Sequence, residues 1–177
     1  MKRPWASFLI SALLALFTAF APVSARAQST LWLGGTGDWG TASNWSAGVP
    51  DAGLDAEIHK SGFIMVTRFG EACRNFTSDI DSAGSGLLVS SGELNISETL
   101  RIAATLGSSA FQLGGSVTAH DLNLGGPLTA GAYIMSGGSL TIDNAVITVP
   151  VPLISGISSF TMSDGVVQIA NSLHIGT

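Results

Sequence analysis

The segment Tyr133-Ile134-Met135-Ser136-Gly137-Gly138-Ser139-Leu140-Thr141-Ile142 is the clearest copy of a pattern that occurs four times between residues 85 and 177. The other copies cover residues 87–96, 111–119 and 160–169. Their central glycines stand at positions 92, 115, 138 and 165, which are 23, 23 and 27 residues apart. A regular period in this range is typical of solenoid folds, in which each repeat buries its apolar face only against its neighbours.

Apolar and polar residues alternate within each copy. The apolar residues two and four positions after the glycine are Leu94, Val117, Leu140 and Val167, followed by Ile96, Ala119, Ile142 and Ile169. A second apolar pair follows in each copy, expected at Leu100 and Ile102, Leu122 and Leu124, Val146 with Thr148 or its neighbours, and Leu173 and Ile175. A period of two predicts short strands with one buried face, about three per coil.

The fold class is therefore predicted as all-β, a parallel β-solenoid of about four to five coils with an N-terminal cap. Stacked coils place like side chains on one another at the strand spacing of about 4.8 Å. The alternative is a β-sandwich, since short alternating strands separated by turn signals also fit that class. Helix is disfavoured, because Gly, Ser and Thr are frequent in the repeats and the period is two.

Residues 1–27 have the features of a secretory signal peptide. Lys2 and Arg3 precede the apolar run 8–20, and Ala25-Arg26-Ala27 matches a small-residue cleavage site. The run is shorter than the roughly 20 residues that span a bilayer, so no transmembrane helix is expected. We expect Sec-type export through the periplasm to the cell surface or the medium, with a Trp/Gly-rich cap at residues 28–61 and solenoid repeats at residues 62–177.

The charge and the cysteine content exclude several kinds of function and site. Without the signal peptide, four basic residues remain against all twelve acidic residues, a net charge of −8. An acidic chain of this kind is not expected to bind nucleic acid, which requires clustered Lys and Arg. Cys73 is the single cysteine, so an internal disulfide and a cysteine zinc site are ruled out. We interpret it as a small buried apolar residue.

Three of the four tryptophans lie between residues 32 and 45. In one interpretation their rings cover the open end of the first coil, because solenoids need atypical terminal units that protect their edges. In the other, Trp39 and Trp45 present flat faces on which a sugar ring stacks.

This opening and the repeats together resemble a known class of proteins. Trp32 to Gly40, Ser43-Asn44-Trp45, Gly48-Val49-Pro50 and the SGGSLTI segment at 136–142 are similar to the N-terminal part of bacterial autotransporter-type passenger domains and related exported β-solenoid surface proteins. The resemblance covers nearly all of the chain after residue 27. It implies a fold and a cell-surface location, and it supplies no catalytic residues.

A catalytic centre is not predicted. In the repeats the acidic residues are spread at about one per coil and Arg101 is the only Lys or Arg, whereas glycoside chemistry needs paired carboxylates. Glu98, Asp121, Asn144 and Asn171 follow their glycines by six positions, and Asp143 is adjacent. Glu98, Asp121 and Asp143 are thus weak candidates for a calcium corner, although Asn and Asp also suit a structural turn.

The sequence favours a non-catalytic exported surface protein, a stalk or passenger segment in adhesion or cell-envelope display. No cofactor is expected, and the partner is expected to be a host surface or an extracellular polysaccharide. The alternative is a carbohydrate-binding or polysaccharide-degrading β-helix module. The edge of the last coil predicts either continuation in a longer chain or self-association.

Overall fold

A computed structural model describes residues 28–79, 86–103, 108–126, 128–148 and 158–176, so the predicted signal peptide lies outside the described residues. About 70 % of the described chain is β-strand. Its elements are β1 (Gln28–Leu31), β2 (Gly37–Asp38), a 3-10 helix η1 (Ala42–Asn44), β3 (Leu54–Ile58), β4 (Phe63–Val66), β5 (Glu71–Cys73), β6 (Phe76–Ser78), β7 (Gly86–Val89), β8 (Glu93–Ile102), β9 (Ser108–Gln112), β10 (Ser116–Leu124), β11 (Gly131–Thr148) and β12 (Ser159–Gly176).

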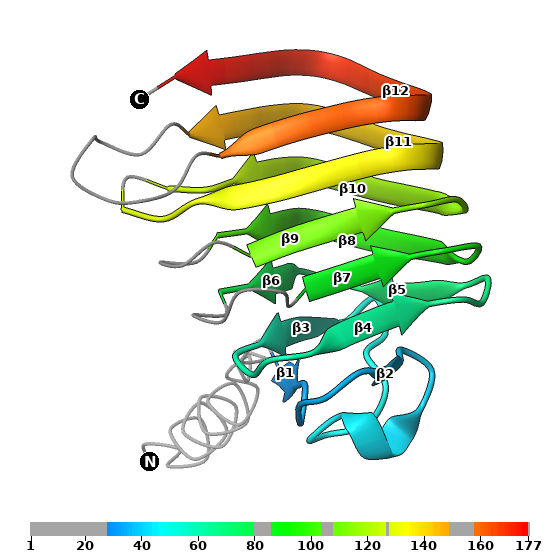
Figure 1. Cartoon of the computed structure of the whole chain (residues 1–177). Coiled ribbons are helices and arrows are strands. Elements are labelled where there is room, and N and C mark those ends of the chain that lie inside the picture. The colour runs from blue at the N-terminus through cyan, green and yellow to red at the C-terminus, as the bar shows by residue number, and fades with distance from the viewer. Residues whose placement is uncertain (1–27, 80–85, 104–107, 127, 149–157, 177) are drawn as a thin grey trace, which may run out of the picture.

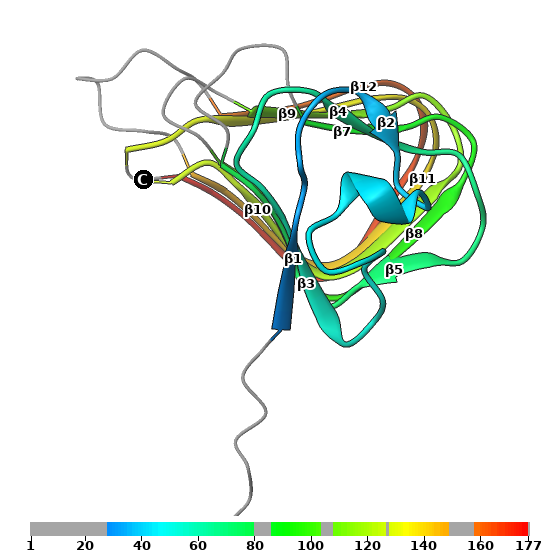
Figure 2. The same ribbon diagram turned by 90° about the horizontal axis from the view of Figure 1, so that it is seen from below.

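The strands form one twelve-stranded sheet that winds around the core, and each pairing between named strands is parallel. Figure 1 shows the coils stacked from the N-terminal end to β12, and Figure 2 shows their common cross-section. The architecture is a β-solenoid of about five turns. It confirms the predicted fold class and excludes the β-sandwich, whose strands form two antiparallel sheets.

Each coil has three sides, which we call the first, second and third in chain order. The first side holds β2, β4, β7, β9 and the starts of β11 and β12. The second holds β5, the first halves of β8 and β10, and the middle of β11 and β12. The third holds β1, β3, β6 and the remaining parts of the long strands.

The register follows the repeats on the second side. Val117 pairs with Leu94 in the coil before it and with Leu140 in the coil after it. These three side chains are at most 1 % exposed, as is expected when like apolar residues stack along the axis. The predicted inward positions of this side are therefore confirmed.

On the third side, one predicted pair of inward residues differs from the structure. The expected apolar pair Val146 and Thr148 is wrong, because the residues aligned with Leu122 and Leu124 are Ala145 and Ile147. Val146 points outward and is 36 % exposed. The inward residues before the corner, Leu140 and Ile142, stand two and four positions after Gly138. Both Asp143 and Asn144 lie at the corner, so the inward residues after it, Ala145 and Ile147, stand seven and nine positions after this glycine.

The glycines at the corner between the first and second sides let neighbouring coils approach closely. Gly115 and Gly138 adopt φ of +67° and +82°, where L-residues are strained. A Cβ at Gly115 would lie 2.1 Å from the carbonyl oxygen of Gly92, one coil below. Gly92 has no positive φ, yet a Cβ there would lie 2.4 Å from the carbonyl oxygen of Arg68. Coil spacing, as well as turn conformation, thus requires glycine.

The stack begins inside the segment predicted as a cap. β3 pairs in parallel with β6 above it and with β1 below it, so both strands are rungs of the third side. Residues 32–53 form the irregular part, which the next section describes. Within the described part of the chain, no helix has the length and apolar character needed to cross a membrane.

We predict that Gly115→Ala lowers the free energy of unfolding by about 2–4 kcal/mol, from left-handed strain and from overpacking against Gly92. The matched control is Gly70→Ala, since Gly70 has φ of +80° and open space around its Cβ position. It should lose about 1–2 kcal/mol, from strain alone. Urea denaturation measures both values, and equal losses would show that coil spacing does not constrain Gly115.

Candidate functional site

The three tryptophans of the opening form one buried cluster. The ring centroids of Trp32 and Trp45, and of Trp39 and Trp45, lie 5.1 Å apart in edge-to-face geometry. Trp39 stacks at 6.0 Å on Phe76, an inward residue of β6. The Trp45 indole N–H donates to the Trp39 carbonyl oxygen at 2.7 Å, and that of Trp32 donates to the Gly35 carbonyl oxygen at 3.0 Å.

The cluster closes the N-terminal end of the apolar core. Trp39 is fully buried and Trp45 is 3 % exposed, so neither ring has a face on which a sugar could stack. The sugar-stacking interpretation of Trp39 and Trp45 is therefore wrong for this conformation. The physical reason is that the first coil would otherwise leave Phe76 and its neighbours in water, and burying the aromatic rings stabilises the fold instead.

A polar column runs along the solenoid where the second side meets the third. Its members, taken from the N-terminal end, are Asp55, Asn75, Thr99, Asp121, Asn144 and Ser172. Of the calcium candidates, Asp121 belongs to the column. Glu98 and Asp143 lie one position before their column members, Thr99 and Asn144. The expected alignment of Glu98 and Asn171 with Asp121 is wrong, because register shifts accompany this corner in those coils.

Side-chain amides and the hydroxyl of Ser172 connect neighbouring members within each half of the column. Asn75 donates from Nδ2 to Asp55 Oδ1 at 2.9 Å, and the backbone N–H of Thr99 donates to Asn75 Oδ1 at 3.1 Å. Asn144 donates from Nδ2 to Asp121 Oδ1 at 3.0 Å, and Ser172 donates from Oγ to Asn144 Oδ1 at 2.9 Å.

Carboxylates in this column therefore alternate with donors, which removes the repulsion that a cation would otherwise have to neutralise. Among the described residues, no group of three or more His, Cys, Asp and Glu side chains has the geometry to hold a metal ion. The corner is a structural hydrogen-bond ladder, the interpretation that turn preferences favoured.

The N-terminal end of the ladder contains an ion pair. Arg74 donates from Nε and Nη2 to the two carboxylate oxygens of Asp55 at 2.8 and 2.7 Å. The hydrogen bond from Arg74 lowers the pKa of Asp55, and the bond from Asn75 adds to this effect. A lowered pKa means that the pair stabilises the fold above the ordinary Asp pKa, and that this stability is lost as the pH falls through the folded-state pKa.

A shallow groove of about 340 Å³ lies on the outer surface of the second side. Its polar lining is Asn95, Ser97, Thr118, His120, Thr141 and Asp143. His120 lies between two carboxylates, with Nδ1 3.2 Å from Asp121 and Nε2 3.7 Å from Asp143. Sequence reasoning missed this groove, although the period carries its signal, since His120 and Asp143 both stand five positions after their glycines.

His59 and Cys73 lie in surroundings that suit a structural role. His59 contacts Glu57 at 2.9 Å and Asp79 at 2.5 Å, and the hydrogen bond to Glu57 raises the pKa of His59. Any stability from this exposed contact is present below the ordinary His pKa and is lost as the pH rises through the folded-state value. Cys73 is fully buried, and burial raises the pKa of its thiol, so the structure confirms the apolar interpretation.

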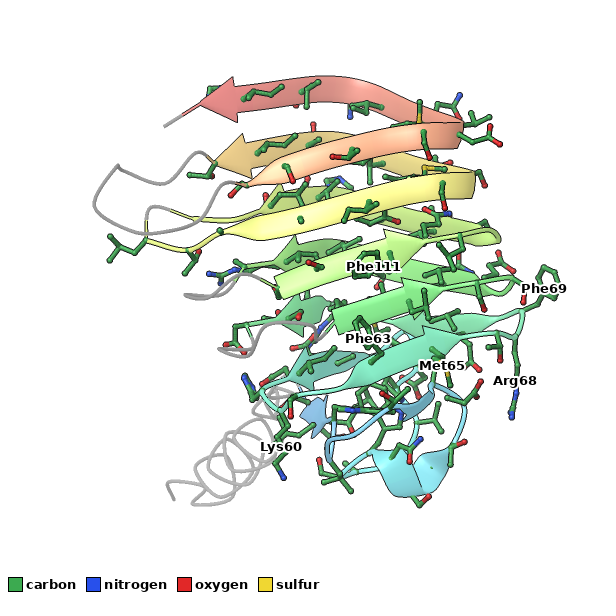
Figure 3. All side chains as sticks on the ribbon, in the orientation of Figure 1. Lys60, Phe63, Met65, Arg68, Phe69 and Phe111 are labelled. Atoms are coloured by element: carbon green, nitrogen blue, oxygen red, sulfur yellow. The ribbon has the colours of Figure 1, made fainter. Side chains whose placement is uncertain are left out.

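The outer face of the first side is unusually apolar for a surface. Met65, Leu88, Phe111 and Ile134 form one outward column through successive pairings. Phe63 packs against Phe111 across one coil, with ring centroids 6.0 Å apart, and Figure 3 shows both on the strands of this side. Each of these five side chains is half-buried. These neighbouring outward side chains thus shield one another from solvent.

Comparisons with family models, with curated proteins and with solved structures found no match to this chain.

The Trp cluster offers a matched pair of substitutions. The indole N–H of Trp39 is buried without a hydrogen-bond partner among the described residues, whereas that of Trp45 donates to a buried carbonyl. We predict that Trp45→Phe lowers the free energy of unfolding by roughly 1–3 kcal/mol more than Trp39→Phe does. Guanidinium denaturation followed by circular dichroism checks this, and the reverse order would contradict the hydrogen bond assigned to Trp45.

The ladder generates a second prediction. Asn144→Asp places a carboxylate against Asp121 and should lower Tm by roughly 2–6 °C. Added calcium should recover part of this loss in the variant and leave the wild-type Tm unchanged. The control is Asn123→Asp, whose pairing neighbours are Arg101 and Val146. A calcium-dependent rise in the wild-type Tm would restore the metal interpretation of Glu98, Asp121 and Asp143.

Proposed function

We propose that this chain is a non-catalytic exported surface protein, in which the β-solenoid is a stalk or passenger segment for adhesion or cell-envelope display. The predicted signal peptide and the resemblance to autotransporter-type passenger domains support export and a surface location. The partner would be a host surface or an extracellular polysaccharide.

The observation that carries this proposal is the unbroken register of the third side. Parallel pairing continues from β1 and β3 through β6, β8, β10 and β11 to β12. Each coil adds one strand spacing of about 4.8 Å to a rod whose core is continuous. The number of repeats therefore sets the length of the rod. The stacking of the repeated side chains makes the rod stiff.

The outer surface fits the same role. On the second side the outward column consists of Ala72, Asn95, Thr118, Thr141 and Gln168, which are short or uncharged side chains. The polar second side and the net negative charge favour solubility outside the cell. It also presents a regular polar surface along its length.

The second candidate is carbohydrate binding, which the groove on the second side favours. Hydroxyl, amide, imidazole and carboxylate groups converge there from three coils over about 340 Å³. Such groups hydrogen-bond the hydroxyls of a glycan chain that runs across the coils. In this second proposal the glycan contacts Asn95, Thr118, His120 and Asp143, and not the buried tryptophan rings.

The surface proposal predicts where the native chain is found and how it begins. Fractionation of native cells should place it at the surface or in the medium, with Gln28 as its first residue, and protease added to intact cells should digest it. A chain retained in the cytoplasm with Met1 intact would contradict export.

Glycan binding by the purified chain separates the two candidates. Saturable binding that is lost in a His120→Ala, Asp143→Ala double variant and kept in Asn123→Ala would favour the groove. No binding across neutral and acidic polysaccharides, with the surface location intact, would favour the stalk. The two measurements fail independently, so each candidate can be rejected alone.

A further inference from the structure

The groove on the second side presents a carboxylate that the rest of the described chain does not use. The carboxylate of Asp143 accepts no hydrogen bond from the described residues, and His120 Nε2 lies 3.7 Å from its Oδ2, beyond hydrogen-bond distance. The Asp143 side chain is 44 % exposed. Asn95 donates from Nδ2 to Glu93 Oε1 at 3.2 Å, which leaves its carbonyl oxygen to accept from a ligand. The groove therefore offers a ligand more acceptors than donors.

The charges around the groove are negative. Among the described residues, no Lys or Arg lines it, whereas Asp143 is part of the lining and Asp121 lies next to His120. Arg74 comes directly after β5, and its guanidinium donates to both carboxylate oxygens of Asp55. Without the signal peptide the whole chain carries a net charge of −8. A ligand that bears carboxylates or phosphates is thus repelled here, and a cationic ligand is attracted.

The groove extends along the solenoid axis. The outward residues along it are Ala72, Asn95, Thr118 and Thr141, one from each of four successive coils. Three coil spacings give a length of about 14 Å, which suits several linked sugars better than one small molecule. Figure 1 shows the strands that supply these residues, β5, β8, β10 and β11, stacked on one another. Polar groups thus recur from coil to coil, as binding to a polymer with a repeating unit requires.

We propose that this groove binds a polysaccharide whose sugars carry free amino groups, with the Asp143 carboxylate accepting hydrogen bonds from a protonated amine. The inference names the ligand class for the carbohydrate-binding candidate and rests on that candidate. An ammonium group has three donors and no acceptor, which complements the acceptors of the groove. Its hydrogen bonds to a carboxylate are charge-assisted and therefore stronger than those of a sugar hydroxyl.

Asp143 suits the amine better than Asp121 does. Asp121 Oδ1 already accepts from Asn144 Nδ2 at 3.0 Å and belongs to the ladder. Thr118 and Thr141 lie in the same groove as Asp143 and hydrogen-bond the hydroxyls of the bound glycan. Acetylation of the amine leaves a neutral amide with a single N–H, so it removes the charge and most of the donors. The groove therefore discriminates by the substituent on the sugar nitrogen.

Calorimetric titration of the purified chain with three oligosaccharides of equal length tests the ligand class. The oligosaccharides consist of glucosamine, of N-acetylglucosamine and of glucuronic acid, at a pH where the amine is protonated. We expect the glucosamine oligomer to bind about 10–100-fold more tightly than the acetylated oligomer, because it gains a charge-assisted hydrogen bond. The glucuronic acid oligomer should not bind. Asp143→Asn should abolish the preference for glucosamine and leave the affinity for the acetylated oligomer unchanged.

Asp79→Asn is the matched control for the loss of one negative charge. Asp79 also lies beside a histidine, His59, but it follows β6 at the end of the third side. This variant should keep the preference for the glucosamine oligomer. If Asp79→Asn and Asp143→Asn weaken binding equally, attraction to the overall charge of the chain accounts for the binding, and the proposal is overturned.

Thr141→Lys tests the groove by reversing its charge. The added ammonium should repel the glucosamine oligomer and allow the glucuronic acid oligomer to bind, whereas Asn123→Lys, on the outer face of the third side, should change neither. Unchanged circular dichroism shows that both variants still fold. Equal affinity of the wild type for the glucosamine and acetylated oligomers would overturn this inference and leave the carbohydrate-binding candidate intact. Binding of none of the three oligomers would reject both.

Discussion

Stacking of like side chains along the solenoid axis is the interaction on which the rest of the structure depends. A parallel coil has almost no core of its own, so Leu94, Val117 and Leu140 are buried only because each lies between the coil before and the coil after. The backbone ladder holds these residues at strand spacing, and burial of apolar area supplies the stability. The stability of the fold is thus approximately a sum of similar contacts between successive coils.

Strand spacing brings requirements that apolar residues do not meet. Backbones that approach at Gly92 and Gly115 leave no room for a Cβ, so the corner must be glycine. At the next corner polar side chains stack instead, and Asn144 links Asp121 to Ser172 by accepting and donating hydrogen bonds. At the N-terminal end of the stack, tryptophan rings cover the apolar core.

The sequence predicted the fold class, the inward positions of the second side and the burial of Cys73, because these follow from local alternation repeated at a fixed period. It failed at the corner before the third side. The constant spacing of 23 residues from Leu122 and Leu124 leads to Ala145 and Ile147, where Val146 and Thr148 were expected. A register shift between β8 and β10 puts Glu98 out of line with Asp121. The groove around His120 was not predicted, although Asn95, Thr118 and Thr141 each stand three positions after a repeat glycine and therefore fall in one outward column.

The most direct test of coil-on-coil stacking is a set of spin-label distances along one outward column. Labels at Asn95 paired in turn with Thr118, Thr141 and Gln168 should lie one, two and three coils apart, with backbone separations of about 5, 10 and 14 Å. The native Cys73 is buried and should not take up the label. A steady increase in this order supports the solenoid; a separation that does not grow with coil number would contradict it.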